Sequence, residues 1–320
     1  MSRRQVLESL SGLLLGMFVS ILAGTVVSTS LPIIVHDLQG DQAAFTWIVT
    51  ATLLTTAIAT PIWGKLADLF NRKLLIQLAL GLFVLATAAA GFAQDPGTMI
   101  TFRAIQGVGA GGLAALSQII MADIISPRER GRYMGLFGAI MALGTVGGPL
   151  LGGFITDAIG WRWNFFVAIP FAIAAIIMLQ MTLHIVQPKP VKRSIDYLGI
   201  VLLSGAVSLI LIWVTNAGKN YDWWSIETVL MAGGGLLLAA LFVLVELRAS
   251  QPLIPLSMFR NRTFTLSVIA SIATGIAMFG TSVFLSQYMQ MARGATPTEA
   301  GLLTLPMIGG LLLSSIPIGH

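Results

Sequence analysis

Ten apolar runs of about 20 residues or more divide this chain of 320 residues, with short polar segments between them. A membrane-spanning helix needs such a run, whereas the strands of a membrane barrel alternate over about 10 residues, and these runs do not alternate. Only 10% of the residues are charged, against about 25% in a soluble domain. The sequence therefore predicts an all-α polytopic membrane protein. The expected spans are 10–35, 45–64, 74–93, 98–121, 133–156, 163–185, 197–216, 226–246, 264–290 and 298–318.

The basic residues are distributed by loop. Fourteen of the 18 Lys and Arg residues fall in the N-terminus and in every second loop after it. The other loops hold only Arg162, Lys219 and Arg293, and Arg103 falls within a span. Since Lys and Arg accumulate on the cytoplasmic side, we predict a cytoplasmic N-terminus. The same distribution explains the net charge of +5, so we expect no nucleic-acid partner.

The residues that enzymatic or metal chemistry needs are scarce. Cysteine is absent and the three histidines are scattered. Gly107, Gly109 and Gly112 spell a dinucleotide-binding pattern, but they lie inside an apolar run rather than after a strand. Close helix packing through small residues is the preferred interpretation. We therefore expect no enzyme, no metal site and no cofactor.

A glycine, an acid and a basic cluster follow the second expected span. The residues are Gly64, Lys65, Asp68, Arg72 and Lys73. A helical turn through this segment would bring Asp68 and Arg72 within pairing distance. The pattern resembles the loop signature that follows the second helix of the major facilitator superfamily. Leu69 and Asn71 depart from it, because a basic residue and a glycine are usual there, and this puts the gating role of the missing basic residue in doubt.

The fourth and fifth spans extend the resemblance. In the fourth span Arg103, Gln106 and Gly107 resemble the superfamily's helix 4 motif. An arginine there should face the bundle interior with a partner, although it could instead reach the outer interface. The fifth span holds a longer pattern, which resembles the motif of the drug/proton antiporter branches and implies export rather than import. Its residues are Gly135, Gly144, Gly148, Pro149, Gly152 and Gly153.

Two further spans, 197–216 and 226–246, stand where a plain facilitator has one long loop. This insertion resembles the 14-helix drug:H+ antiporter branch. The expected organisation is a complete six-helix bundle at 1–186, two inserted linker helices at 187–250, and the first two helices of an incomplete second bundle at 251–320.

The resemblance implies a proton-coupled exporter of small amphipathic or cationic compounds. It also implies a multi-pass protein of the plasma membrane, specifically a bacterial inner membrane. The first helix of this branch usually carries an aspartate where this chain has Ala23, so Asp37 and Asp123 are the candidates for charge coupling. One hypothesis pairs Asp37 with Arg103. A second joins Asp68, Arg72 and Asp123 in a cluster that closes the inner gate.

The expected partners are the substrate, protons and the lipid bilayer, while an outer-membrane or adaptor partner stays open. Met17, Thr25, Gln118 and Met141 are a suggested substrate lining. An importer of a small solute, or a non-transporting membrane fragment or interaction partner, are the alternatives.

Overall fold

The computed structural model describes residues 3–125, 130–183, 196–218, 220–249, 252–303 and 306. Apart from an isolated bridge between Ala217 and Tyr221, all the described secondary structure is helical. The elements are α1 (Arg3–Asp37), α2 (Gln42–Leu69), α3 (Arg72–Gly91), α4 (Pro96–Ile124), α5 (Arg130–Ile159), α6 (Trp163–Phe166), α7 (Ala168–Thr182), α8 (Tyr197–Asn216), α9 (Ile226–Thr228), η1 (Val229–Gly233), α10 (Gly234–Arg248), η2 (Leu256–Arg260), α11 (Arg262–Arg293) and α12 (Pro297–Leu303).

Eight helical segments in the described chain are long and apolar enough to cross a membrane, and they coincide with the first eight predicted spans. The sixth span contains a break at Val167, between α6 and α7, and the eighth passes from α9 through η1 into α10. At the ninth predicted span, α11 is 32 residues long. Most of the tenth predicted span lies outside the described residues. The prediction of an all-α polytopic membrane fold is confirmed.

Polar side chains begin several of these helices. Asp41, Asn71, Asp95 and Asp196 each accept a backbone N–H from the first turn of the helix that follows, which satisfies a donor that has no partner within the helix. At the other end of α11, Gly294 adopts a left-handed conformation with φ 68° and ends the helix.

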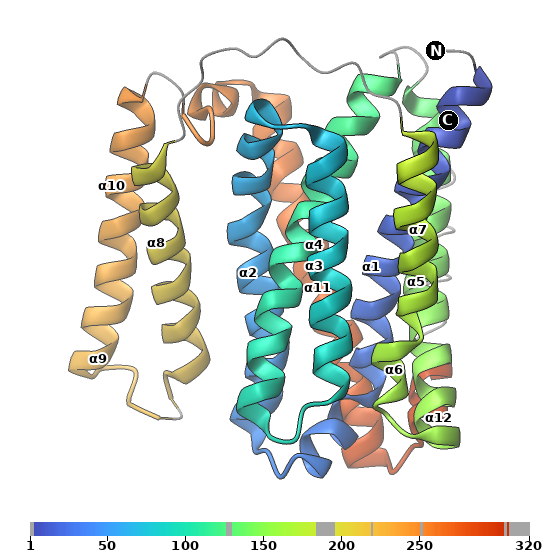
Figure 1. The fold of residues 1–320 in the computed structure, drawn as a ribbon. Helices are drawn as coiled ribbons and strands as arrows, with labels where there is room; N and C mark the ends of the chain where they lie inside the picture. The colour runs from blue at the N-terminus through green and yellow to red at the C-terminus, as the bar shows by residue number, and fades with distance from the viewer. Residues whose placement is uncertain are drawn as a thin grey trace.

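Helices α1 to α7 form one bundle (Figure 1). Within it α4 packs along α2 and α3, and α1 packs along α5 and α7. Helices α8 and α10 form a hairpin beside α2, while α11 contacts α1 and α12 contacts α5. The predicted boundaries near 186 and 250 fall on residues outside the described ranges, so the three-domain division stays a prediction.

The two ends of the bundle carry different connections. The end at the top of Figure 1 holds the start of α1, the α2–α3 connection and the end of α4, and we call it the inner end. The opposite, outer end holds the α1–α2, α3–α4, α5–α6 and α11–α12 connections. These names follow the predicted orientation, which itself stays a prediction.

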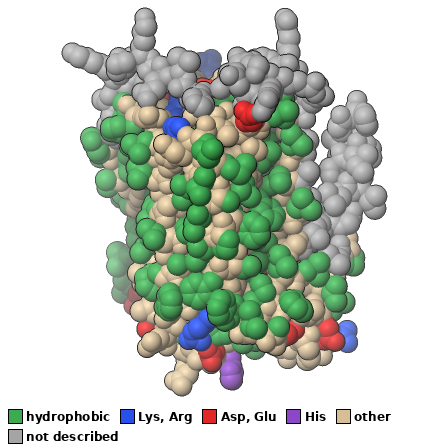
Figure 2. Space-filling model, turned by 45° about the vertical axis from the view of Figure 1, so that its right-hand side comes forward, with side chains coloured by type: hydrophobic (Ala, Val, Ile, Leu, Met, Phe, Trp, Pro, Cys, Tyr) green, Lys and Arg blue, Asp and Glu red, His purple; other side chains and the backbone are tan. Residues whose placement is uncertain are grey.

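The bundle core consists of two clusters of buried apolar side chains, one of which lies nearer the outer end and includes Ile48 and Phe165. Large apolar side chains also cover the outside, among them Leu85, Phe154 and Leu237. Figure 2 shows hydrophobic side chains over the middle of the visible face and charged side chains toward its ends. An apolar surface of this kind fits a lipid environment.

Candidate functional site

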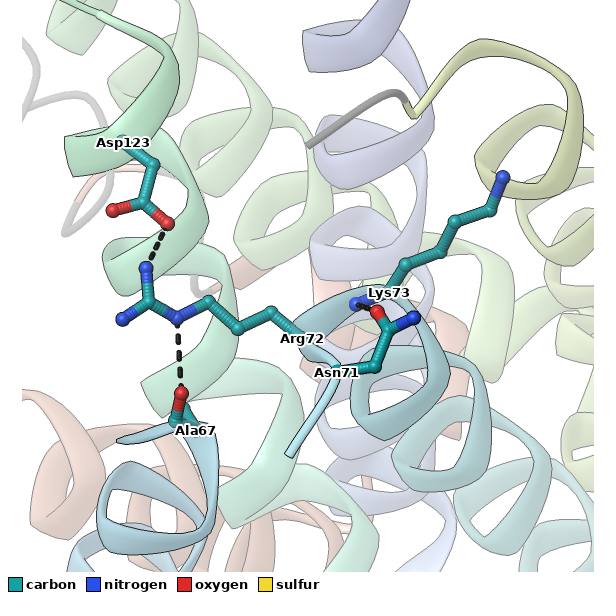
Figure 3. A network of polar contacts seen from close by, with 5 residues as sticks. All are labelled: Ala67, Asn71, Arg72, Lys73 and Asp123. Atoms are coloured by element: carbon teal, nitrogen blue, oxygen red, sulfur yellow. Dashed lines mark hydrogen bonds and ion pairs between the residues drawn. The ribbon is translucent and has the colours of Figure 1, made fainter. Parts of the chain in front are cut away.

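Arg72, at the start of α3, links the ends of α2 and α4 at the inner end (Figure 3). Its Nη1 atom pairs with Oδ2 of Asp123, and its Nε atom donates to the carbonyl oxygen of Ala67 at 3.0 Å. Asn71 places Arg72 by accepting the backbone N–H of Lys73 at 2.9 Å as the cap of α3. The Arg72 and Asp123 side chains are 14% and 31% exposed, so the pair is partly shielded from solvent.

No helical turn joins Asp68 to Arg72. Helix α2 ends at Leu69, and Phe70 is extended, with φ −120° and ψ 170°. Asp68 is half-buried in the last turn of α2, next to the Ala67 carbonyl that Arg72 binds, but it belongs to a different helix from Arg72. The structure thus brings Arg72 and Asp123 together, while the gating role of the set that includes Asp68 stays a prediction.

The other residues of this motif occupy varied surroundings. The Nζ atom of Lys73 donates to the carbonyl oxygen of Gln180 on α7 at 2.7 Å. Lys65 is half-buried on α2. A Cβ atom on Gly64 would meet no described atom within 4 Å, so packing in the described part of the chain does not require a glycine there.

Arg103 is buried inside the bundle, with only 6% of its surface exposed, so the alternative that it reaches the outer interface is wrong. Its Nη1 atom donates to Oε1 of Gln106 at 2.6 Å, and its Nε atom donates to the carbonyl oxygen of Ile48 at 3.4 Å. Gln106 Nε2 then donates to Oγ1 of Thr87 at 2.7 Å. This chain connects α2, α3 and α4 and satisfies polar groups that have no access to water.

Asp37 does not pair with Arg103 as hypothesised, because residues of the α5–α6 connection occupy its carboxylate. Its Oδ2 atom accepts from Nη1 of Arg162 and from Nε1 of Trp161, both at 2.9 Å. The Arg162 guanidinium also lies 4.2 Å from the Trp161 ring centre and donates to the carbonyl oxygen of Ala93 at 3.1 Å. The sequence reasoning counted Arg162 only as an outer-loop charge and missed this contact.

The glycines of α4 permit close packing, in agreement with the packing interpretation. A Cβ on Gly107 would overlap Thr52 and Thr55 of α2. A Cβ on Gly109 would come within 2.7 Å of the backbone nitrogen of Phe83 on α3. Backbone contact between neighbouring helices is therefore possible only with small residues here.

The glycine motif of α5 packs against α1 and α12. Cβ atoms at Gly148 and Gly152 would overlap Thr25 and Val26 of α1, and one at Gly144 would lie 2.7 Å from Cγ2 of Ile21. The Thr25 hydroxyl donates to the carbonyl oxygen of Gly144 at 2.9 Å.

Two further members of the motif lie at the contacts of α5 with α1 and α12, which we call the α5 seam. Pro149 lies inside α5, and the Thr29 hydroxyl of α1 donates to its carbonyl oxygen at 3.5 Å. Gly153 faces α12, where its Cβ would lie 2.6 Å from the carbonyl oxygen of Pro297. Gly135 also belongs to α5, but its surroundings lie outside the described part.

A buried polar cluster next to this motif was missed by the sequence reasoning. Ser30 and Thr156 lie 2.6 Å apart between their hydroxyl oxygens, and Nδ2 of Asn164 donates to Oγ1 of Thr156 at 2.8 Å. All three side chains are buried. Each comes from a different helix, so no spacing in the sequence points to the cluster.

Only two of the four residues suggested to line a substrate site are exposed. Gln118 and Met141 are exposed. Met17 packs against the core cluster that contains Leu80, and the Thr25 hydroxyl is used in the α1–α5 contact. No group of three or more metal-ligating side chains occurs among the described residues.

Comparisons with known proteins agree with this architecture. A family profile described as Major Facilitator Superfamily matches residues 13–320. Multidrug transporter protein MdtP of Bacillus subtilis is 36% identical over 317 residues, which are 98% of this chain and 58% of that protein. Multidrug resistance protein 3 of the same organism is 33% identical over 309 residues, 95% of this chain and 59% of that protein. Efflux pump dotC of Dothistroma septosporum is 34% identical over 305 residues, 94% of this chain and 52% of that protein.

Solved structures show the same fold at low sequence identity. The proton:xylose symporter XylE has a TM-score of 0.63 at 14% identity, with coverage of 98% of this chain and 68% of that chain. The human organic anion transporter MFSD10 has a TM-score of 0.53 at 17% identity, with coverage of 93% and 73%. The chain spans between half and three-fifths of the length of the three curated relatives named above.

Proposed function

Because this chain belongs to the Major Facilitator Superfamily, and is therefore a multi-pass protein of the plasma membrane and not an enzyme, we propose that it exports small amphipathic or cationic compounds in exchange for protons. The observation that carries this proposal is the glycine and proline motif of α5. Its glycines lie in backbone contact with α1 on one side and α12 on the other. Relatives named as multidrug transport, multidrug resistance and efflux proteins support export of drugs.

Close packing along the α5 seam suits an exporter, because an exporter must not let solutes leak along α5. Glycines on one face of α5 remove the side chains that would otherwise hold the helices apart. Pro149 cannot donate a backbone hydrogen bond inside α5, which favours a bend where α1 and α12 meet this helix. We propose that this tightly packed seam blocks passage along α5 while the two bundles rearrange.

The inserted hairpin supports assignment to the 14-helix drug:H+ antiporter branch. Two spans, Tyr197–Asn216 and Ile226–Arg248, follow the first bundle and pack mainly on each other beside α2. A loop connection would not need two segments that are apolar enough to span a membrane.

We further propose that the Arg72–Asp123 pair stabilises closure of the inner end. It links α2, α3 and α4 where α2 and α4 end and α3 begins. Proton coupling is assigned to carboxylates near the helix ends, with Asp123 and Asp37 as the candidates, because Ala23 leaves the middle of α1 without an acid.

Reconstituted vesicles test the proposed function. When a proton gradient is imposed, the full chain should export a panel of cationic dyes against their concentration gradients, and this uphill export should stop when the proton gradient is collapsed. A version extended to the length of the relatives is assayed in parallel. Dye uptake in place of export would indicate an importer, and no movement by either version would indicate a protein that does not transport these compounds.

A further inference from the structure

The first turn of α12 leaves one backbone donor for a partner outside the helix. Thr296 is the N-cap residue: its hydroxyl accepts the N–H of Glu299 at 3.2 Å, and Glu299 Oε2 accepts the N–H of Thr296 at 2.9 Å. Pro297 has no N–H, and the N–H of Ala300 donates to the carbonyl oxygen of Thr296 at 2.8 Å. Within this turn, the N–H of Thr298 therefore needs an acceptor from elsewhere.

Asp157, in the last turn of α5, provides that acceptor. Its Oδ2 atom accepts the Thr298 N–H at 3.2 Å and also the Thr298 hydroxyl. The two residues are 141 positions apart, and they join the first bundle to the segment formed by α11 and α12. A carboxylate at a helix N-terminus also interacts favourably with the helix dipole.

Two glycines bring the helix backbones close enough for this contact. A Cβ on Gly153, one turn before Asp157, would lie 2.6 Å from the carbonyl oxygen of Pro297. A Cβ on Gly301 would lie 2.6 Å from the carbonyl oxygen of Pro149. Side chains at either position would push α12 away from α5 and remove Thr298 from Asp157.

The hydrogen bonds of α11 to the first bundle lie at the same outer end. Gln290 donates to the carbonyl oxygen of Thr29 at 2.6 Å, and Gln287 donates to Oε1 of Gln42 at 2.9 Å. Ser286, in the same part of α11, is completely buried. These contacts hold α11 against the first bundle at the outer end of the described structure.

We propose that Asp157 is the latch that holds α12 on α5 and keeps the outer end closed. Loss of its carboxylate shifts the chain toward a conformation in which α11 and α12 separate from the first bundle at this end. The place of this latch in a transport cycle rests on the proposed function, but its effect on conformation does not.

The absence of cysteine allows a direct test on the full chain. Ser286→Cys serves as a buried reporter, and its rate of modification by a polar maleimide is measured in nanodiscs. Asp157→Ala should raise this rate about tenfold, which corresponds to about 1.4 kcal/mol. Asp157→Asn keeps one acceptor oxygen and should raise it less. Thr298→Val removes only the hydroxyl donor and should raise it about threefold, so a folding defect in one variant does not leave the proposal undecided.

Asp95→Ala is the matched control. Asp95 accepts the N–H of Thr98 at 2.9 Å and its hydroxyl at 2.8 Å, so it makes the same kind of contact at the same end, but within α4. Its removal should leave the reporter rate unchanged. An unchanged rate in both Asp157→Ala and Thr298→Val, or an equal rise in Asp95→Ala, would overturn the latch. Because labelling needs no transport, a chain that labels as expected but exports no dye contradicts the proposed function alone.

Discussion

Adding one methyl group to Gly148 should force α1 and α5 apart, whereas the same change at the neighbouring Gly147 should be tolerated. A Cβ at Gly148 would lie 2.6 Å from Cβ of Thr25 and 3.2 Å from its carbonyl carbon, and it would also overlap the hydroxyl. A Cβ at Gly147 would meet no described atom within 4 Å. The two positions are adjacent in the same helix, so they form a matched pair.

The expected difference follows from two contributions. Replacing Gly by Ala inside a helix favours the helix by about 1 kcal/mol, and both variants share this gain. Overpacking costs about 1–3 kcal/mol and applies only at Gly148. At roughly 2–4 °C per kcal/mol, Gly148→Ala should unfold roughly 2–12 °C below Gly147→Ala.

Thermal unfolding of the purified full chain in detergent measures this difference. Combining Gly148→Ala with Thr25→Gly removes the side chain that the new methyl group would meet, and part of the lost stability should return. Equal unfolding temperatures for the two alanine variants would refute the close α1–α5 contact, and so would a Thr25→Gly combination that recovers nothing.

Three further outcomes are expected. Charge reversal at either Arg72 or Asp123 should abolish dye export while changing the free energy of unfolding by about 1 kcal/mol or less, and exchanging the two residues should restore part of the export rate. Gln106→Leu removes the acceptor of the buried Arg103 guanidinium and should cost about 1–3 kcal/mol in chemical unfolding. The hydrogen bonds that Asp95 accepts hold its pKa below its usual value of 3.8, so the stability lost in Asp95→Asn should be constant above that pH and should vanish as the pH falls through the lowered pKa, as an unfolding series against pH would show.

The spans were predictable because a run of apolar residues is a local property of the sequence. Eight of the ten predicted spans appear as membrane-length helices in the described chain. The break between α2 and α3 was harder to predict from the sequence. Asp68 and Arg72 are four residues apart, a spacing that would allow pairing within one helix, but Asn71 caps a new helix between them. The sequence allowed either one continued helix or a new helix capped by Asn71. The four-residue spacing of Asp68 and Arg72 could not distinguish between these two.

The partners of Asp37 and Asp157 were not predictable from their positions along the chain. The hypothesis paired Asp37 with Arg103 near the outer face, but the turn before α6 brings Arg162 and Trp161 to Asp37 instead. Arg103 turns inward to Gln106, a partner three residues away that the sequence could have supplied. Contacts such as Asp157 with Thr298 depend on how α12 docks on α5, which no local pattern specifies.

The reciprocal coupling of dye and proton movement tests the central claim most directly. Vesicles that contain the full chain are loaded with a cationic dye at equal pH inside and outside, and are then diluted into dye-free buffer. An antiporter predicts that dye leaving the vesicles drives protons in, so the lumen should acidify only when the chain is present. Dye loss with an unchanged lumen pH, or with a rise in lumen pH, would contradict proton-coupled export.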